Sequence, residues 1–101
     1  MAQSGDPGPA SLSLLRGAGE KVLIFDLATD STSLGRLPTN VIQLDSSKVS
    51  KRHACIERHP HGYEVVDSGS RNGTSVNGEK VSRRMLIHGD ELMLGDVTLR
   101  F

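Results

Sequence analysis

The sequence is poor in cysteine and in aromatic residues. Cys55 is the single cysteine among 101 residues, which excludes an internal disulfide and a zinc cluster built from several cysteines. Tryptophan is absent and only three aromatic side chains are present, so the core must be built from Val, Ile and Leu, which favour β structure. A chain of this length forms one domain with enough core to fold without cross-links.

Net charge and long apolar runs are also missing. Twelve Lys and Arg residues balance twelve Asp and Glu residues, so no overall field attracts the chain to nucleic acid or to a membrane. No apolar run approaches the length of a membrane span, and the first twenty residues lack the basic and apolar regions of a signal peptide. We therefore expect an intracellular, cytoplasmic protein (nuclear if the source is eukaryotic) that is a monomer and needs no cofactor.

Composition divides the chain into two parts. Residues 1–19 are rich in Gly, Pro, Ser and Ala and contain only a short leucine patch. Such a segment cannot bury enough surface to offset the entropy lost on ordering, which predicts a flexible tail or a cloning remnant. Residues 20–101 form the predicted domain.

Short apolar runs bounded by turn residues recur through this domain. They predict strands at 21–27, 31–34, 41–44, 53–59, 62–67, 74–76, 80–86, 91–94 and 97–101. The 80–86 run is rich in arginine, which favours an exposed edge, and Asn77-Gly78 is a strong tight-turn signal. Many short strands without a helical period predict an all-β fold, an antiparallel β-sandwich. Its loops gather at the two ends, where binding residues are expected.

Two polar clusters flank the strands predicted at 53–59 and 62–67. The first is Ser50-Lys51-Arg52-His53, and the second runs from Arg71 to Gly78 with the sequence RNGTSVNG. A hairpin of the two strands would bring both clusters to the same edge of a sheet. Cations, hydroxyls and Asn amides beside glycines are the groups with which a protein holds an oxyanion, most often phosphate.

Five motifs occur in order over residues 21–101. They are Gly35-Arg36, Ser50-x-x-His53, Asn72-Gly73-Thr74, Asn77-Gly78 and the closing run from Leu86 to Gly95, LIHGDELMLG. Together they resemble the signature of the forkhead-associated (FHA) domain, the family that reads phosphothreonine peptides. The resemblance implies a sandwich of about eleven strands whose loops at one end bind phosphothreonine on a partner protein. It also implies a role in kinase-dependent signalling or assembly, without catalysis.

The resemblance assigns the phosphate to residues of the first loops. Arg36 has a planar fork of donors that can grip two phosphate oxygens at once. The hydroxyl of Ser50 is expected to donate to a third phosphate oxygen. Lys51 adds a second cation, with an ordinary solvated lysine as the alternative, and Arg52 can point toward the site or away from it.

Three residues of the second cluster are expected to contact the ligand or to hold the loops. Arg71 stands where the family often has a small residue or Thr, so it either strengthens phosphate binding or reaches an acidic neighbour on the peptide. The amide of Asn72 can pair with the peptide backbone beside the phosphothreonine in either hydrogen-bonding sense. Asn77 holds the peptide backbone or the loop, and Asn-Gly is also simply the best pair for a type I′ turn.

Four further motif residues are assigned to the architecture of the site. His53 is expected to fix the loops through hydrogen bonds, and Thr74 to support them. Gly35 and Gly73 allow a close backbone approach or a positive φ. None of these four residues is expected to touch the phosphate.

Rival functions find weaker support in the residues. A Ser50–His53–Asp67 triad lacks the glycine pattern of a nucleophile elbow, and Cys55 fits a packed thiol in an alternating strand. No metal site is expected, because His59 and His61 have no carboxylate or cysteine support. A nucleic-acid surface would need aromatic side chains among its cations. The alternative that stays open is an FHA-like scaffold that binds proteins without phosphate.

The predicted ligand lies outside the N-terminal segment. Some FHA proteins bind a phosphothreonine of their own tail, but residues 1–28 contain serines and no threonine. We therefore expect a phosphothreonine ligand that comes in trans, from a partner protein or peptide or from sequence outside these 101 residues.

Overall fold

The computed structural model describes residues 8–16 and 23–101, which form eleven strands and no helix. The strands are β1 Ser11–Arg16, β2 Ile24–Asp26, β3 Ser31–Gly35, β4 Ile42–Gln43, β5 Ala54–His59, β6 Gly62–Asp67, β7 Thr74–Val76, β8 Glu79–Val81, β9 Arg83–Met85, β10 Glu91–Leu94 and β11 Val97–Arg100. The predicted all-β fold is confirmed. Within the described ranges, no segment is a helix that could cross a membrane.

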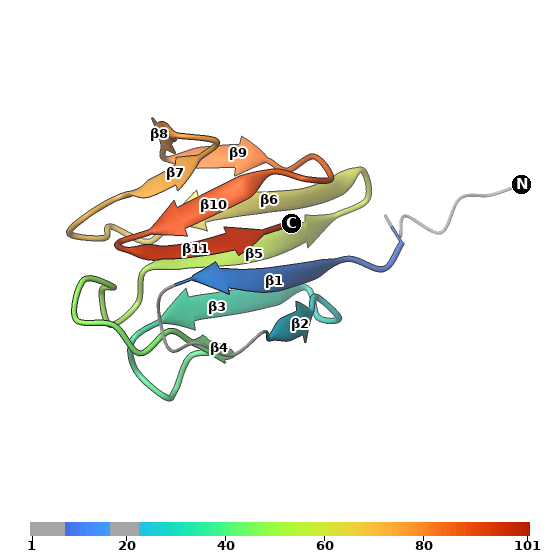
Figure 1. Ribbon diagram of the computed structural model, residues 1–101. Coiled ribbons are helices and arrows are strands. Elements are labelled where there is room, and N and C mark those ends of the chain that lie inside the picture. Colours follow the sequence, from blue (N-terminus) through green and yellow to red (C-terminus); the bar gives the residue numbers. More distant parts are fainter. Residues whose placement is uncertain (1–7, 17–22) are drawn as a thin grey trace, which may run out of the picture.

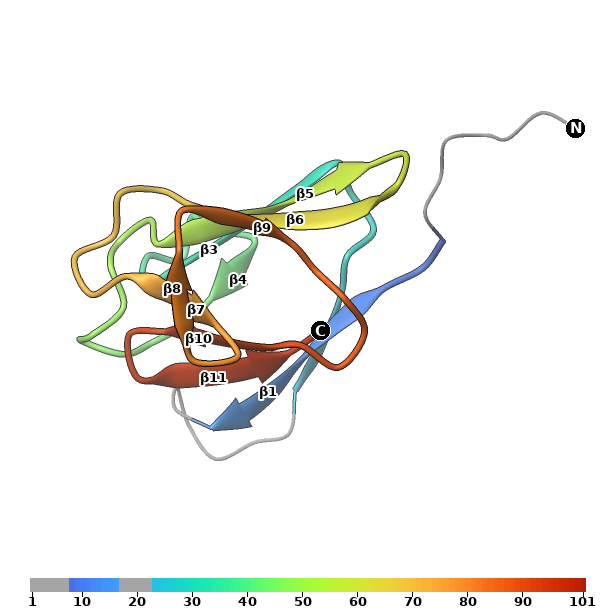
Figure 2. The ribbon, with the colours of Figure 1, turned by 90° about the horizontal axis from the view of Figure 1, so that it is seen from above.

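The strands form two sheets that face each other as the layers of a sandwich (Figures 1 and 2). One sheet has six strands in the order β2-β1-β11-β10-β7-β8, and the other has five in the order β4-β3-β5-β6-β9. The pairings between the described strands are antiparallel except that of β3 with β4, which is parallel. The predicted antiparallel sandwich is therefore confirmed, with one parallel pair beside the β3–β4 loop.

The core consists of the residues that face inward from both sheets. Leu92 and Leu94 of β10 lie opposite Leu99 and Val97 of β11, and all four are buried. Their pairing closes a two-residue turn at Gly95-Asp96. Each such side chain contributes about 1.5–3 kcal/mol when it is fully buried.

Strand β1 lies within the segment predicted as a flexible tail, so that prediction is wrong for residues 11–16. The strand pairs with both β11 and β2, and it buries Leu12 and Leu14 in the core. Ser and Leu alternate over Ser11 to Leu14, and the pairing turns this alternation into an inner and an outer face. The domain therefore includes β1, whereas residues 1–7 and 17–19 of the predicted tail lie outside the described residues.

Removing the buried side chain of β1 tests this assignment. Leu12 is completely buried, so Leu12→Ala is expected to lower the free energy of unfolding by about 2–5 kcal/mol. Urea denaturation measures the change. Leu15→Ala is the matched control, because Leu15 on the same strand is 42% exposed and its loss should cost little. An unchanged midpoint for Leu12→Ala would show that residues 11–16 add nothing to the fold.

The run predicted as one strand at 80–86 divides between the two sheets. Strand β8 pairs with β7 in the larger sheet, whereas β9 pairs with β6 in the smaller one. Both halves are edge strands, as the arginine-rich sequence indicated. The chain thus crosses between the sheets at Ser82, whose carbonyl oxygen accepts a hydrogen bond from the Asp67 amide (2.8 Å).

Candidate functional site

Four loops meet at one end of the sandwich, at the left of Figures 1 and 2. They follow β3, β4, β6 and β10. The first three surround a cavity of about 310 Å³ that is lined by Arg36, Ser47, Lys48, Val49, Ser50, Lys51, Arg52, Arg71 and Asn72. All five residues predicted to bind phosphothreonine (Arg36, Ser50, Lys51, Arg71 and Asn72) are therefore brought together.

Ser50 is the centre of this site. Its carbonyl oxygen accepts a hydrogen bond from the Arg36 amide (3.0 Å), and its hydroxyl oxygen accepts one from the Arg71 amide (2.9 Å). These bonds place one arginine on each side of the serine. Because the hydroxyl oxygen is the acceptor from Arg71, its hydrogen is left to donate to a ligand.

The guanidinium of Arg36 is held by the neighbouring loop. Its Nε donates to the carbonyl oxygen of Val49 (3.0 Å). The two terminal nitrogens therefore keep their donors for a ligand, and the side chain is oriented before binding.

Asn72 also fastens one loop to another. Its Nδ2 donates to the carbonyl oxygen of Lys48 (2.7 Å), which leaves the amide oxygen as an acceptor for a peptide N–H group. Lys48 and Val49 thus belong to the site through their backbone carbonyl groups, a role that their side chains do not reveal in the sequence.

Asn40 is a supporting residue that sequence reasoning missed. It is buried, and its Nδ2 donates to the carbonyl oxygens of Leu37 (2.9 Å) and Lys51 (2.8 Å). These bonds pin the loop after β3 against the loop after β4. The available signal was an Asn just after Leu37-Pro38-Thr39, since Asn near Pro commonly bonds to the backbone in turns.

His53 joins the loop after β4 to the loop after β6. The side chain is fully buried, and its Nδ1 accepts a hydrogen bond from the Ser50 amide (3.0 Å). Nε2 therefore carries the proton and donates to the carbonyl oxygen of Gly73 (2.8 Å). Both ring nitrogens are used for the backbone of the two loops.

The loop after β6 is organised around Asp67. Its carboxylate accepts hydrogen bonds from the hydroxyls of Ser70 (2.5 Å) and Thr74 (2.7 Å) and from the amides of Gly69 and Ser70. Burial raises the pKa of Asp67, but these hydrogen bonds outweigh it and leave the pKa below its usual value. The ionised carboxylate and the buried Thr74 thus hold the loop that carries Arg71 and Asn72.

The two motif glycines meet different steric demands. A Cβ added to Gly35 would clash with the carbonyl oxygen of Lys51 and with the side-chain amide of Asn40. Gly73 has a φ of +84°, a left-handed conformation that other residues rarely adopt. The first glycine therefore allows a close approach of loops, and the second allows the turn that leads into β7.

Asn77 does not line the cavity. With Gly78 it forms the turn between β7 and β8, and both residues have positive φ (51° and 84°), as a type I′ turn requires. Its Nδ2 donates to Asp90 Oδ1 (2.9 Å) and its Oδ1 accepts from the Glu91 amide (3.0 Å). Of the two roles expected for Asn77, these contacts are those of a loop-holding residue.

The hydrogen bonds of Ser50, His53 and Asp67 are not those of a catalytic triad. The ring of His53 contacts the amide of Ser50 rather than its hydroxyl, and Asp67 is engaged by Ser70 and Thr74. Burial and the charge of Glu57 raise the pKa of Cys55, which keeps the thiol protonated and poorly nucleophilic.

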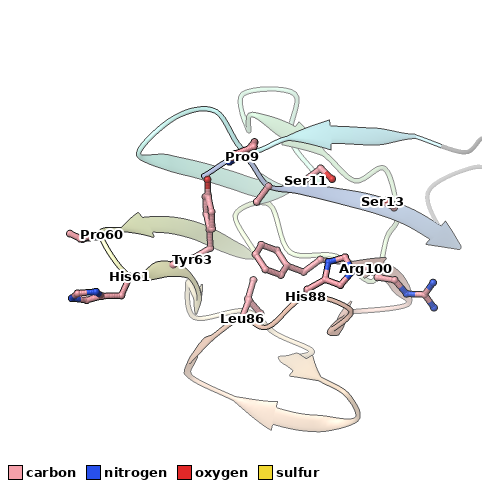
Figure 3. A pocket seen from close by; sticks show the side chains of 12 residues that line it. Pro9, Ser11, Ser13, Pro60, His61, Tyr63, Leu86, His88 and Arg100 are labelled. Atoms are coloured by element: carbon pink, nitrogen blue, oxygen red, sulfur yellow. The ribbon is translucent and has the colours of Figure 1, made fainter. Parts of the chain in front are cut away.

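A larger cavity of about 570 Å³ lies at the opposite end of the sandwich (Figure 3). Its wall includes the rings of Tyr63 and Phe101, whose centroids are 5.7 Å apart. Arg100 lines it as well, but its guanidinium is paired with Glu91 (2.8 Å). None of the residues predicted to bind phosphate lies there.

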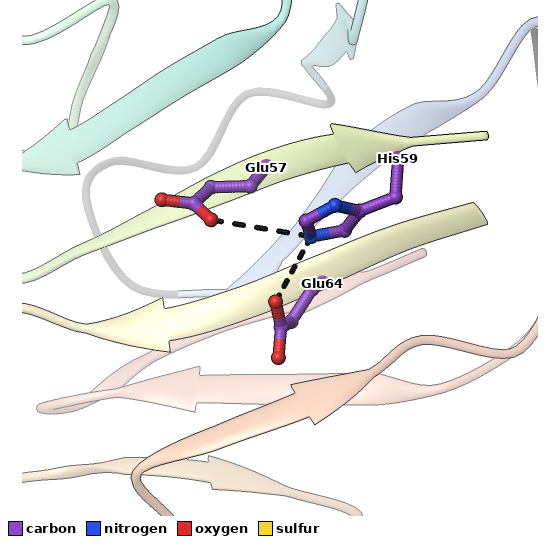
Figure 4. A group of neighbouring side chains, drawn as sticks. All are labelled: Glu57, His59 and Glu64. Carbon is purple, nitrogen blue, oxygen red and sulfur yellow. Dashed lines mark hydrogen bonds and ion pairs between the residues drawn. The ribbon is translucent and has the colours of Figure 1, made fainter. Parts of the chain in front are cut away.

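Two carboxylates, those of Glu57 and Glu64, lie beside His59 (Figure 4). The expectation that His59 has no carboxylate beside it is therefore wrong. Its Nε2 lies 3.0 Å from a carboxylate oxygen of Glu64 and 4.0 Å from one of Glu57. Glu64 is also bonded by Arg83 through two nitrogens, at 2.8 and 3.1 Å. The group is thus an ion-pair network on the outer face of β5, β6 and β9.

This network makes a testable contribution to pH-dependent stability. The hydrogen bonds from Arg83 and His59 lower the pKa of Glu64 to about 2. Because the folded pKa lies below the unfolded one, the contribution is present above about pH 4.5 and is lost as the pH falls toward 2. When the pH falls from 5 to about 2, the free energy of unfolding is expected to decrease less for Glu64→Gln than for the unmodified protein. Urea titrations at each pH measure this difference. Parallel pH profiles for the two proteins would contradict this assignment.

Known proteins resemble this chain in sequence and in fold. The FHA domain family matches residues 32–95. The oxoglutarate dehydrogenase inhibitor of Corynebacterium jeikeium is 44% identical over 93% of this chain and 65% of its own length. The glycogen accumulation regulator GarA of Mycobacterium tuberculosis is 44% identical over 94% of this chain and 58% of its own length. The chain thus spans less than two thirds of the length of these curated relatives.

A solved structure supports the same relationship. It comes from a structural and functional analysis of phosphothreonine-dependent FHA domain interactions, and it is 29% identical to this chain with a TM-score of 0.78. The alignment covers 90% of this chain and 94% of that one. The predicted family is confirmed: the chain belongs to the FHA domain family.

Proposed function

We propose that this FHA domain binds phosphothreonine on a partner protein and catalyses no reaction. The observation that carries the proposal is the 310 Å³ cavity between the three loops. Among the residues that the structure describes, its lining combines five cationic side chains with two serines and an Asn amide, and it contains no carboxylate. Such a lining suits a phosphate dianion, which carries about −1.5 to −2 charges at pH 7.

The proposed contacts follow from the donors that the loops leave available. The terminal nitrogens of Arg36 and the hydroxyl of Ser50 bind phosphate oxygens, and Lys51 and Arg71 add positive charge. Asn72 pairs with the peptide backbone beside the phosphothreonine. Hydrogen bonds between the loops hold these groups in place before binding, so little motion is needed and an affinity near micromolar, about 8 kcal/mol, is expected.

The relatives support a regulatory setting. One is an inhibitor of oxoglutarate dehydrogenase and the other a regulator of glycogen accumulation, and both are bacterial. We infer that this domain acts in the cytoplasm as a monomer, on a phosphorylated protein rather than on nucleic acid or a membrane. The ligand is proposed to lie outside residues 1–28, which contain no threonine.

Titration calorimetry tests this function with three matched peptide pools, one with phosphothreonine, one with phosphoserine and one unphosphorylated. Micromolar binding of the phosphothreonine pool alone is the expected result, because the loops are proposed to leave room for the γ-methyl group. Binding that ignores the phosphate would instead support the scaffold alternative, in which a sheet face contacts the partner. Failure of every pool to bind would refute phosphopeptide recognition.

A further inference from the structure

Three side chains that can ligate a metal gather on the outer face of the smaller sheet (Figure 4). Glu57 and His59 are two residues apart on β5, so both point to the same face, and Glu64 lies directly opposite Glu57 on β6. One oxygen of each carboxylate and the Nε2 of His59 lie within 4.8 Å of one another. None of these three residues lines the phosphate cavity, so the group stands apart from the proposed function.

The register of β5 and β6 lets the ring of His59 reach both carboxylates. The residue opposite His59 is Gly62, which has no side chain to fill the space across the strand. The imidazole leans toward β6, and its Nε2 lies 3.0 Å from Glu64 Oε1 and 4.0 Å from Glu57 Oε1. The ligands of a tetrahedral Zn²⁺ ion are about 3.3 Å apart when its bonds are about 2.0–2.1 Å long. The two observed spacings lie on either side of this value.

The charges on this face favour a further cation. Glu57 and Glu64 form a cross-strand pair of like charges, an arrangement that destabilises a sheet. Arg83 bonds to Glu64 through two nitrogens, at 2.8 and 3.1 Å. Glu57 instead lies beside the His59 ring and 3.8 Å from the thiol of Cys55. Two carboxylates thus share this arginine, and the cluster keeps a net negative charge when His59 is neutral.

The donor set selects the kind of ion. Imidazole together with carboxylate oxygen suits Zn²⁺, whereas Mg²⁺ and Ca²⁺ prefer oxygen ligands alone. Zn²⁺ on Glu64 Oε1 would replace the longer bond from Arg83 and leave the shorter one, from Nε to Oε2, to orient the carboxylate. His59 would release any proton on Nε2 as it becomes a ligand.

We propose that Glu57, His59 and Glu64 bind a Zn²⁺ ion that cross-links β5 and β6. Water completes the coordination, because the side chains of Glu57 and His59 are each 39% exposed and the site opens to solvent. The ion stabilises the domain, since a ligand that binds the folded chain alone shifts the unfolding equilibrium.

Titration calorimetry of chelator-treated protein with zinc chloride tests the site. One Zn²⁺ per chain is expected, and Mg²⁺ and Ca²⁺ should bind at least about tenfold more weakly. The urea midpoint of the unmodified protein should rise when Zn²⁺ is present. Absence of Zn²⁺ binding, or an equal affinity for Ca²⁺, would overturn the proposal without touching the proposed phosphothreonine binding.

Two variants test the ligands. Glu57→Gln removes one ligand and leaves the bonds between Glu64 and Arg83 in place, so the fold should be retained. It is expected to weaken Zn²⁺ binding by at least about tenfold, the lower end of the loss for an outer-shell partner alone. His59→Ala should weaken binding by at least as much. Zinc affinity that survives both substitutions would overturn the inference.

Two further variants are controls for neighbouring zinc-binding side chains. His61→Ala removes an exposed histidine of the β5–β6 turn that lies outside the ligand group. Cys55→Ser removes the thiol beside Glu57, which also lies outside that group. Both variants are expected to keep the zinc affinity of the unmodified protein. Loss of binding in either one would place the ion on other ligands and contradict the assignment.

Discussion

Arg36→Ala is expected to weaken phosphothreonine-peptide binding by at least about 100-fold. The substitution removes two terminal donors that bind phosphate as charge-assisted hydrogen bonds, each of which contributes about 1.5–3 kcal/mol. Since 1.4 kcal/mol corresponds to about a tenfold change in affinity, the loss takes a micromolar ligand to a Kd of about 0.1 mM or weaker. The fold should persist, because among residues 8–16 and 23–101 the Arg36 side chain gives up a single hydrogen bond, from Nε to the Val49 carbonyl oxygen.

Two variants separate the effect of charge from that of geometry. Arg36→Lys keeps a positive charge but loses the planar fork and the Nε contact, so we expect a loss of about tenfold. Arg58→Ala removes an arginine that is paired with Asp30 on another part of the surface, and it should leave affinity unchanged. If Arg36→Ala bound the peptide within threefold of the unmodified protein, Arg36 would not contact the phosphate.

His53→Ala is expected to lower the free energy of unfolding by about 3 kcal/mol and to weaken peptide binding as well. The substitution leaves a buried cavity, and it removes the ring nitrogens that bond to the Ser50 amide and to the Gly73 carbonyl oxygen. Through these two bonds the ring of His53 joins the loop that carries Ser50 to the loop that carries Arg71. Urea denaturation and peptide titration of the same variant measure the two effects.

His61→Ala is the control for the histidine itself. His61 is exposed in the β5–β6 turn at the other end of the sandwich, so its removal should change neither stability nor affinity. An unchanged unfolding midpoint together with an unchanged peptide affinity for His53→Ala would contradict the bridging role of the buried ring. Normal stability with weak binding would limit that role to the loops.

The sequence predicted strands best where the local pattern decides the structure. The strands at 62–67 and 74–76 agree with β6 and β7 residue for residue, because each alternates and ends at turn residues. The pattern at 80–86 predicts one strand, because such a pattern cannot show where a chain changes sheets. That change depends on pairing with β7 on one side and β6 on the other.

The error at β1 has a related cause. The overall composition of residues 1–19 indicated disorder, yet Ser11, Leu12, Ser13 and Leu14 alternate as a half-buried strand does. Burial of the two leucines needs β11, which lies at the other end of the chain. The partner strand, rather than the local sequence, provides the surface that orders this segment.

In the site, too, some features follow from the sequence motifs and others depend on how distant segments pack. The resemblance to the FHA signature predicted that Arg36, Ser50 and Asn72 act together, and the structure places them around one cavity, since loops at one end of a sandwich converge. The contacts of Asn40 and of the Lys48 backbone were missed, because they depend on how two loops pack against each other. His59 and Glu64 likewise meet only through the β5–β6 register.

The most direct test of the binding site is an NMR titration of the isotopically labelled protein with a phosphothreonine peptide. The largest amide shift changes are expected at Arg36, Ser50 and Arg71, whose backbone groups meet at the cavity between the loops. The unphosphorylated peptide should leave these amides unchanged. Shift changes centred instead on Gly62, His88 and Phe101, around the cavity at the opposite end, would contradict the account.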